Sequence, residues 1–109
     1  MGHIETVVYK HVSPPANITP PSAVAGKKLV VYALSTCGFC ERAMKFLQDL
    51  GLGYDFIFID ELEPWIKAAL KEELKERFGA ATVFPYLVID DSTTVVGYTE
   101  EKWRTGLGL

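Results

Sequence analysis

Apolar residues fall into three successive groups between positions 29 and 59. Residues 29–34 (LVVYAL) form a continuous apolar run, and its Val and Tyr content predicts a strand buried on both faces. Beyond it, apolar side chains recur at intervals of three and four, which predicts an amphipathic helix that ends near Gly51. The apolar positions of this helix are Cys40, Ala43, Met44 and Leu47. Residues 54–59 (YDFIFI) then predict a second strand.

The second half of the chain predicts another helix, a hairpin and a short last helix. Pro64 suits the first turn of a helix, and Gly79 suits its end. The apolar stripe of this helix consists of Ile66, Ala69, Leu70, Leu74 and Phe78. Residues 86–89 and 94–96 predict two strands, because turn-forming residues separate them. Thr99 can cap the last helix.

The order of these elements predicts the topology. The initial strand–helix–strand unit implies two parallel strands, because a helix is the usual crossover between parallel neighbours. The closing hairpin adds an antiparallel edge. We therefore expect an α/β domain over residues 27–109, with a four-stranded mixed sheet and helices on its faces. A chain of 109 residues is long enough for one such domain with its own core.

Residues 1–26 have a different character. They hold four of the six prolines of the chain: Pro14, Pro15, Pro20 and Pro21. Because proline fixes its backbone angle and lacks an amide donor, we expect no regular element from Ser13 to Gly26. Residues 4–9 are apolar enough to form a short additional strand. We expect residues 1–26 to be an extended or mobile segment in front of the domain.

Composition and charge narrow the range of partners. The chain has 14 acidic and 11 basic residues, for a net charge of -3, whereas nucleic-acid binding needs a concentrated basic face. No apolar run reaches the roughly 18 residues that a membrane span needs. The N-terminus also lacks the basic and then apolar pattern of a signal peptide. We expect a cytoplasmic monomer that binds neither nucleic acid nor membrane.

The chain has only two cysteines, Cys37 and Cys40. A secreted disulfide scaffold would carry more of them, spread along the sequence. A structural zinc site usually takes four ligands, and the two histidines, His3 and His11, lie in the N-terminal stretch that we expect to be poorly ordered. We therefore expect no metal site. Two cysteines separated by two residues at a strand-to-helix junction indicate a thioredoxin-like redox pair.

The position of Cys37 predicts its chemistry. An ordinary cysteine has a pKa of about 8.5, yet the thiolate is the form that attacks a disulfide. Cys37 follows a predicted strand and stands at the start of a predicted helix, with Ser35 and Thr36 before it as candidate caps. The unpaired amides and partial positive charge of a helix N-terminus favour a thiolate. Cys40, nearly one turn later, can attack a mixed disulfide at Cys37 and release the reduced product.

Three motifs in this order resemble the glutaredoxin family. STCGFC at 35–40 resembles its cysteine-x-x-cysteine site, and TVFPYLVID at 82–90 resembles its threonine-valine-proline segment with the strand that follows. VVGYTEE at 95–101 resembles the glycine-containing segment before the last helix. The likeness covers about residues 28–109 and implies a thioredoxin-like fold. It also implies an enzyme that exchanges thiols and disulfides, with Cys37 attacking and Cys40 resolving.

The resemblance also implies a substrate site. Phe39 matches the aromatic residue between the cysteines, and Pro85 matches a cis-proline that faces the active site. The cis bond would turn the backbone of Phe84 outward to pair with a peptide or glutathione, although a proline can also simply open a strand. Gly97 belongs to the third motif. Thr99 and its neighbour Glu100 lie where family members contact the charged end of glutathione, although helix capping and the helix dipole explain them too.

Some positions depart from the family pattern. Family members that use glutathione often have a lysine shortly before the first cysteine, where this chain has Ala33 and Leu34. Gly38 stands where proline is usual, and the double glycine of the third motif is Val96-Gly97. No bound cofactor is needed for dithiol chemistry. The electron donor can therefore be glutathione, another low-molecular-weight thiol, or a flavin-dependent thioredoxin reductase, and the substrates are protein disulfides or glutathione mixed disulfides.

Two other functions remain open at this level. CGFC differs by one residue from the CGFS motif of monothiol glutaredoxins that hold an iron–sulfur cluster between two subunits, and thiolates are natural cluster ligands. The other possibility is a redox-inactive domain that binds a partner at its sheet edge. In that case a Cys37→Ser substitution would leave the function unchanged.

Overall fold

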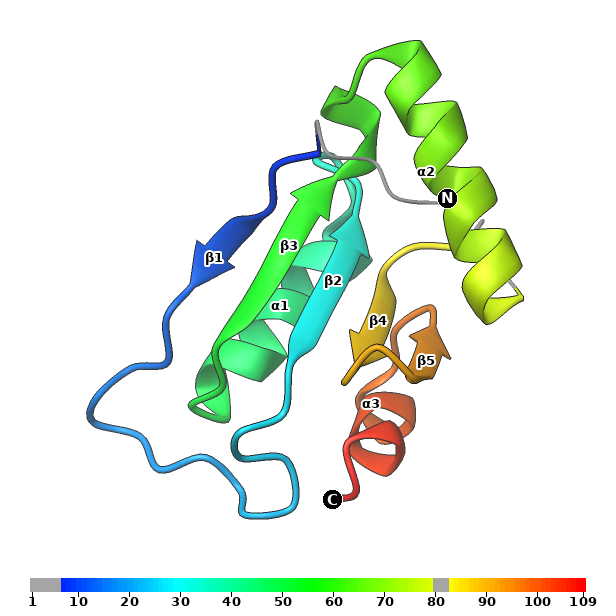
Figure 1. The fold of residues 1–109 in the computed structure, drawn as a ribbon. Coiled ribbons are helices and arrows are strands. Elements are labelled where there is room, and N and C mark those ends of the chain that lie inside the picture. Colours follow the sequence, from blue (N-terminus) through cyan, green and yellow to red (C-terminus); the bar gives the residue numbers. More distant parts are fainter. Residues whose placement is uncertain (1–6, 80–82) are drawn as a thin grey trace.

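The computed structural model describes residues 7–79 and 83–109. They form a five-stranded mixed sheet and three α-helices (Figure 1). The strands are β1 (Lys10–Val12), β2 (Leu29–Ala33), β3 (Tyr54–Phe58), β4 (Tyr86–Ile89) and β5 (Thr93–Val96). The helices are α1 (Gly38–Asp49), α2 (Pro64–Phe78) and α3 (Glu100–Gly106), and a 3-10 turn, η1 (Ile59–Glu61), follows β3. No helix in these residues is long and apolar enough to cross a membrane.

The sheet has the order β1-β3-β2-β4-β5. The strands β2 and β3 are parallel, as the strand–helix–strand order predicts, and the β4–β5 hairpin is antiparallel. The expected number of four strands is wrong, because β1 pairs antiparallel with the free edge of β3. Another small difference is Ile59, which belongs to η1 rather than to the preceding strand.

The additional strand lies later than residues 4–9. Residues 4–6 lie outside the described part of the chain, Val7–Tyr9 is not in a strand, and β1 starts at Lys10. The apolar pattern does not predict β1, because the side chains of Lys10 and His11 are exposed. Only backbone pairing with β3 defines this strand. As predicted, no helix or strand forms from Ser13 to Gly26.

Alternate residues of the central strands build two cores, one on each face of the sheet. On one face, Val31, Ala33 and Leu87 pack with the buried sides of α1 and α3. On the other face, strand residues pack against Leu70 and Leu74 of α2. The residues from the strands and η1 are Val30, Tyr32, Ile57, Ile59, Tyr86 and Val88. This arrangement explains the unbroken apolar runs, since strands covered on both faces have no polar side.

The α2 stripe is narrower than the spacing predicts. Ile66, Leu70 and Leu74 are buried, Phe78 is half-buried, and Ala69 is exposed. The helix is the only one on its face of the sheet within the described residues (Figure 1). One line of side chains four residues apart is enough for this contact, so a position beside the line stays in solvent.

Candidate active site

Cys37 is the N-terminal cap of α1. Its backbone is extended, and its Sγ accepts a hydrogen bond from the backbone N–H of Cys40 at 3.2 Å. Neither Ser35 nor Thr36 is the cap, because the helix begins one residue later than a Thr36 cap requires and two residues later than a Ser35 cap requires. The sulfur itself therefore occupies the position where a helix terminus presents unpaired N–H groups, and it accepts one of them. The side chain is only half-buried, so a disulfide can reach it.

Cys40 has the opposite environment. It is fully buried in the first turns of α1 and belongs to the core shared with β2 and α3. Burial raises the pKa of the Cys40 thiol to about 12, and the hydrogen bond with Cys37 adds to this effect. Cys40 is therefore a protonated thiol at neutral pH. The two cysteines, both free here, are three residues apart but differ in exposure.

Phe39 projects from α1 between the two cysteines. Its ring is 57% exposed, and the guanidinium of Arg42 lies 4.6 Å from the ring centre. The cation covers one part of an aromatic surface that would otherwise be in water. Phe39 therefore presents an exposed aromatic surface two residues from Cys37.

The Phe84–Pro85 peptide bond is cis, as the resemblance implies. Pro85 is buried and Phe84 is half-buried. Because Tyr32 of β2 is paired with Tyr86 of β4, the segment before β4 lies beside the end of β2, which is where the chain turns towards Cys37. The sheet register thus places the proline segment and the cysteines at one end of the sheet.

Gly97 joins the proline segment to α3. Its N–H donates to the Pro85 carbonyl at 2.8 Å, and its own carbonyl accepts from the indole N–H of Trp103 at 2.8 Å. Its φ of +76° is in the left-handed region, which glycine adopts without a penalty. The conformation and both hydrogen bonds explain a glycine here without any ligand.

Thr99 and Glu100 have structural partners. The Thr99 hydroxyl caps α3 by accepting from the Lys102 N–H at 3.1 Å, and Glu100 forms an ion pair with Arg104 at 2.9 Å. Both side chains remain exposed at the start of α3. The capping explanation is therefore confirmed. A contact of Phe39, Phe84, Pro85, Gly97 or Thr99 with substrate stays a prediction.

A residue that the sequence reasoning missed is Asp60 in η1. Its carboxylate accepts hydrogen bonds from both the backbone N–H of Ser35, at 2.9 Å, and the Ser35 hydroxyl. These hydrogen bonds lower the pKa of Asp60. They hold the turn that carries Cys37. The available signal was topological, because Ser35 and Asp60 each follow one of two strands predicted to be parallel neighbours.

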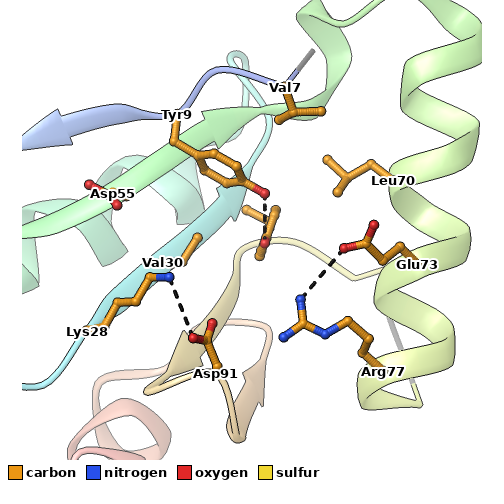
Figure 2. A pocket seen from close by; sticks show the side chains of 10 residues that line it. Val7, Tyr9, Lys28, Val30, Asp55, Leu70, Glu73, Arg77 and Asp91 are labelled. Atoms are coloured by element: carbon orange, nitrogen blue, oxygen red, sulfur yellow. Dashed lines mark hydrogen bonds and ion pairs between the residues drawn. The ribbon is translucent and has the colours of Figure 1, made fainter. Parts of the chain in front are cut away.

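A cavity of about 410 Å³ lies on the opposite face of the sheet, between the segment before β1 and α2 (Figure 2). Two ion pairs flank it, Lys28–Asp91 at 3.6 Å and Glu73–Arg77 at 3.7 Å. The hydroxyl of Tyr9 also contacts that of Tyr32 at 3.0 Å. This cavity has no cysteine in its lining, and the sheet separates it from the core that contains Cys40. Among the described residues, no group of three or more Cys, His, Asp or Glu is arranged to hold a metal ion.

Residues 29–93 match the family model described as Glutaredoxin. This range covers more than half of the chain and contains both cysteines, the cis-proline and β4. The chain belongs to the glutaredoxin family. No match was found among curated proteins.

Solved structures agree with this assignment. The glutaredoxin from Methanosarcina mazei Go1 is 31% identical, with a TM-score of 0.68, over 93% of this chain and 88% of that chain. The methanoredoxin of Methanosarcina acetivorans is 33% identical, with a TM-score of 0.64, over 75% of this chain and 85% of its own. The glutaredoxin grx-1 from Archaeoglobus fulgidus is 32% identical, with a TM-score of 0.62, over 76% and 88%. The fold is therefore thioredoxin-like, and the two nearby cysteines, Cys37 and Cys40, support thiol–disulfide oxidoreductase chemistry in general.

Proposed function

We propose that the chain is a dithiol oxidoreductase that reduces disulfides of proteins or mixed disulfides with glutathione. The observation that carries this proposal is the unequal pair of sulfurs. Cys37 Sγ is accessible and accepts the Cys40 N–H at the N-terminus of α1, whereas the Cys40 thiol is buried and its pKa is raised. Cys37 is therefore suited to attack an external disulfide, and Cys40 is suited to stay protonated until the mixed disulfide has formed.

The reaction has two exchange steps. The Cys37 thiolate attacks a substrate disulfide, forms a mixed disulfide with one substrate sulfur and releases the other as a thiolate that takes up a proton. Cys40 then loses its proton and attacks Cys37 Sγ, which releases the second substrate thiol. The substrate gains two electrons, and the pair becomes a Cys37–Cys40 disulfide. Because burial keeps Cys40 protonated, the second step requires that its proton leave as the new bond forms.

The oxidised pair must then be reduced. Two molecules of glutathione, two of another low-molecular-weight thiol, or a flavin-dependent thioredoxin reductase can supply the two electrons. The surface of Phe39, Phe84, Pro85, Gly97 and Thr99 would hold the substrate or the thiol beside Cys37. We further propose that the protein works as a cytoplasmic monomer, because dithiols stay reduced in that compartment.

A coupled assay tests this function. Reduction of hydroxyethyl disulfide is followed through NADPH consumption, either with glutathione and glutathione reductase or with thioredoxin reductase. We expect activity in at least one of the two systems and none for Cys37→Ser. The donor that supports activity identifies the reductant. Absence of Cys37-dependent activity in both systems would contradict the proposal, and visible absorbance after anaerobic purification would then favour the iron–sulfur alternative.

A second variant separates dithiol from monothiol chemistry. Cys40→Ser keeps the attacking sulfur but lacks the resolving one. We expect this variant to accumulate a mixed disulfide with a protein substrate, detectable as a mass increase that a reducing agent reverses. If Cys40→Ser reduces protein disulfides at the wild-type rate, the resolving role of Cys40 is wrong.

A further inference from the structure

A groove of about 630 Å³ begins beside the candidate active site and follows α1. It starts at Gly38, the residue after Cys37, and extends to Gln48. Ten residues of helix correspond to about 15 Å, which four to five residues of extended chain can span. On its other side lie Tyr54 and Phe56 of β3. The groove, which we call the α1 groove, is thus longer than a small disulfide needs.

Phe56 is the partly exposed aromatic residue in the lining on the β3 side of the α1 groove, and Phe58 lies beside it. Phe56 and Phe58 are half-buried, and their ring centres are 5.2 Å apart. The ammonium of Lys10, from β1, lies 5.8 Å from the centre of the Phe56 ring and 5.4 Å from that of Phe58. This surface offers apolar area to a side chain and a cation above it.

The charges around the α1 groove favour an acidic occupant. Lys45 is neutralised by Asp49 at 3.3 Å. Neither Lys10 nor Arg42 forms an ion pair within the described residues, and Glu41 is the one described carboxylate in the lining of the groove. His11 and Asp55 pair with each other at 2.7 Å, and Asp55 lines the cavity on the other face of the sheet. The groove is therefore locally basic in a chain whose net charge is -3.

We propose that the α1 groove binds a polypeptide segment of the disulfide substrate that carries an aromatic or large apolar side chain and a carboxylate. This inference rests on the proposed function, because the groove opens beside Cys37. It names proteins rather than small thiols as the substrate class. The apolar side chain would pack on Phe56 and Phe58, and the carboxylate would meet Lys10 and Arg42.

The test uses disulfides that release a coloured thiol when Cys37 attacks. Three probes are made with 2-nitro-5-thiobenzoate as one partner. The reference probe has mercaptoethanol as the other partner. The acidic peptide probe has a cysteine followed within five residues by Phe and Asp, and the basic peptide probe has Lys in place of Asp. The rate of colour release gives the second-order rate constant of the first exchange step, without any external reductant.

We expect the wild-type protein to react about two- to fivefold faster with the acidic than with the basic peptide at low salt, as one exposed charge pair typically provides. The net charge of the chain would favour the opposite order. The preference should shrink in high salt, because screening weakens exposed charge pairs. Lys10→Glu should reverse the preference. Lys27→Glu, a matched charge reversal at an exposed position outside the groove, should leave it unchanged.

Each outcome separates the groove from the proposed function. No Cys37-dependent release from the reference probe would contradict the function itself. Normal release from that probe, combined with equal rates for the two peptides or with the same preference in Lys10→Glu, would overturn the groove proposal alone. A reversal in both Lys10→Glu and Lys27→Glu would show a general charge effect and would also overturn it.

Discussion

The two ends of the sheet contrast in how tightly their glycines are packed. At the end with Cys37, a Cβ added to Gly38 would meet only the Arg42 guanidinium, at 3.9 Å. At the opposite end, where the chain passes from β1 to β2 (Figure 1), a Cβ on Gly51 would lie 2.7 Å from Ile18 Cγ2, and one on Gly53 would lie 2.7 Å from Pro14 Cδ. The end with Cys37, which we call the open end, thus has free space at its glycine. The opposite end, which we call the closed end, is tightly packed at both of its glycines.

This contrast shows how the proline-rich segment contributes. Residues 13–26 form no regular element, yet Val24 is buried in the core of the α1 face. Ile18 and Pro14 approach so closely that only glycine fits opposite them. The segment thus packs closely against the turn between the end of α1 and the start of β3. The reactive end keeps its exposed side chains, such as Phe39 and Val83, because nothing comparable covers them in the described residues.

The largest expected effect concerns the open end. Cys37→Ser should abolish release from the reference probe, since the hydroxyl of serine is not a thiolate nucleophile. The unfolding free energy of Cys37→Ser should match that of the reduced wild-type protein to within about 1 kcal/mol, because the side chain is half-buried and a serine hydroxyl can cap α1 in its place. A large loss of stability in this variant would instead make Cys37 a structural residue.

The next largest effect concerns the closed end. Gly51 has a φ of +78°, and its Cβ would also approach the Ile18 carbonyl oxygen at 2.9 Å. Gly51→Ala should therefore lower the free energy of unfolding by about 2–4 kcal/mol, from left-handed strain and steric overlap. Denaturant unfolding measures this change. The rate constant of folded Gly51→Ala with the reference probe should equal that of the wild type.

Gly38→Ala is the matched control for this prediction. Its added methyl group has free space, and alanine suits the first residue of a helix better than glycine. We expect its stability to change by less than about 1 kcal/mol, in the stabilising direction. Equal destabilisation by the two glycine substitutions would show that the two ends do not differ in packing.

A smaller effect should appear at high pH. Burial raises the pKa of Cys40 to about 12, so the folded protein holds this proton more tightly than the unfolded chain. The corresponding stability is present below about pH 9 and is lost as the pH rises towards 12. The difference in unfolding free energy between the reduced wild-type protein and Cys40→Ser should fall over this range. Tyrosines such as Tyr54 titrate in both proteins, and a difference independent of pH would contradict the assignment.

The smallest expected effect concerns Asp60 at the open end. The hydrogen bonds from Ser35 lower the pKa of Asp60 below its ordinary value of 3.8. The stability that the ionised carboxylate contributes is therefore present above pH 3.8, and it is lost as the pH falls through the lower pKa of the folded protein. The unfolding free energies of the wild-type protein and of Asp60→Asn, measured between pH 5 and pH 2, should therefore converge on acidification. Parallel curves would mean that the carboxylate contributes no charge-dependent stability.

The apolar pattern predicts most of the fold because burial is a property of each position along an element. The run at 29–34 and the spacing from Cys40 to Leu47 identify β2 and α1. The missed strand, β1, has two exposed side chains and is defined by backbone hydrogen bonds to β3. A pattern of side chains has no information about such pairing.

The sequence by itself determined the dithiol, its place at a strand-to-helix junction and the mixed order of the central strands. Only the tertiary structure decided that Cys37 Sγ caps α1, that Cys40 is buried, and that Asp60 holds Ser35. It also decided which glycines have no room for a side chain, because Gly51 meets a residue 33 positions earlier, Ile18. The physical reason is that periodicity records which face of an element is buried, whereas these contacts depend on which distant segment covers that face.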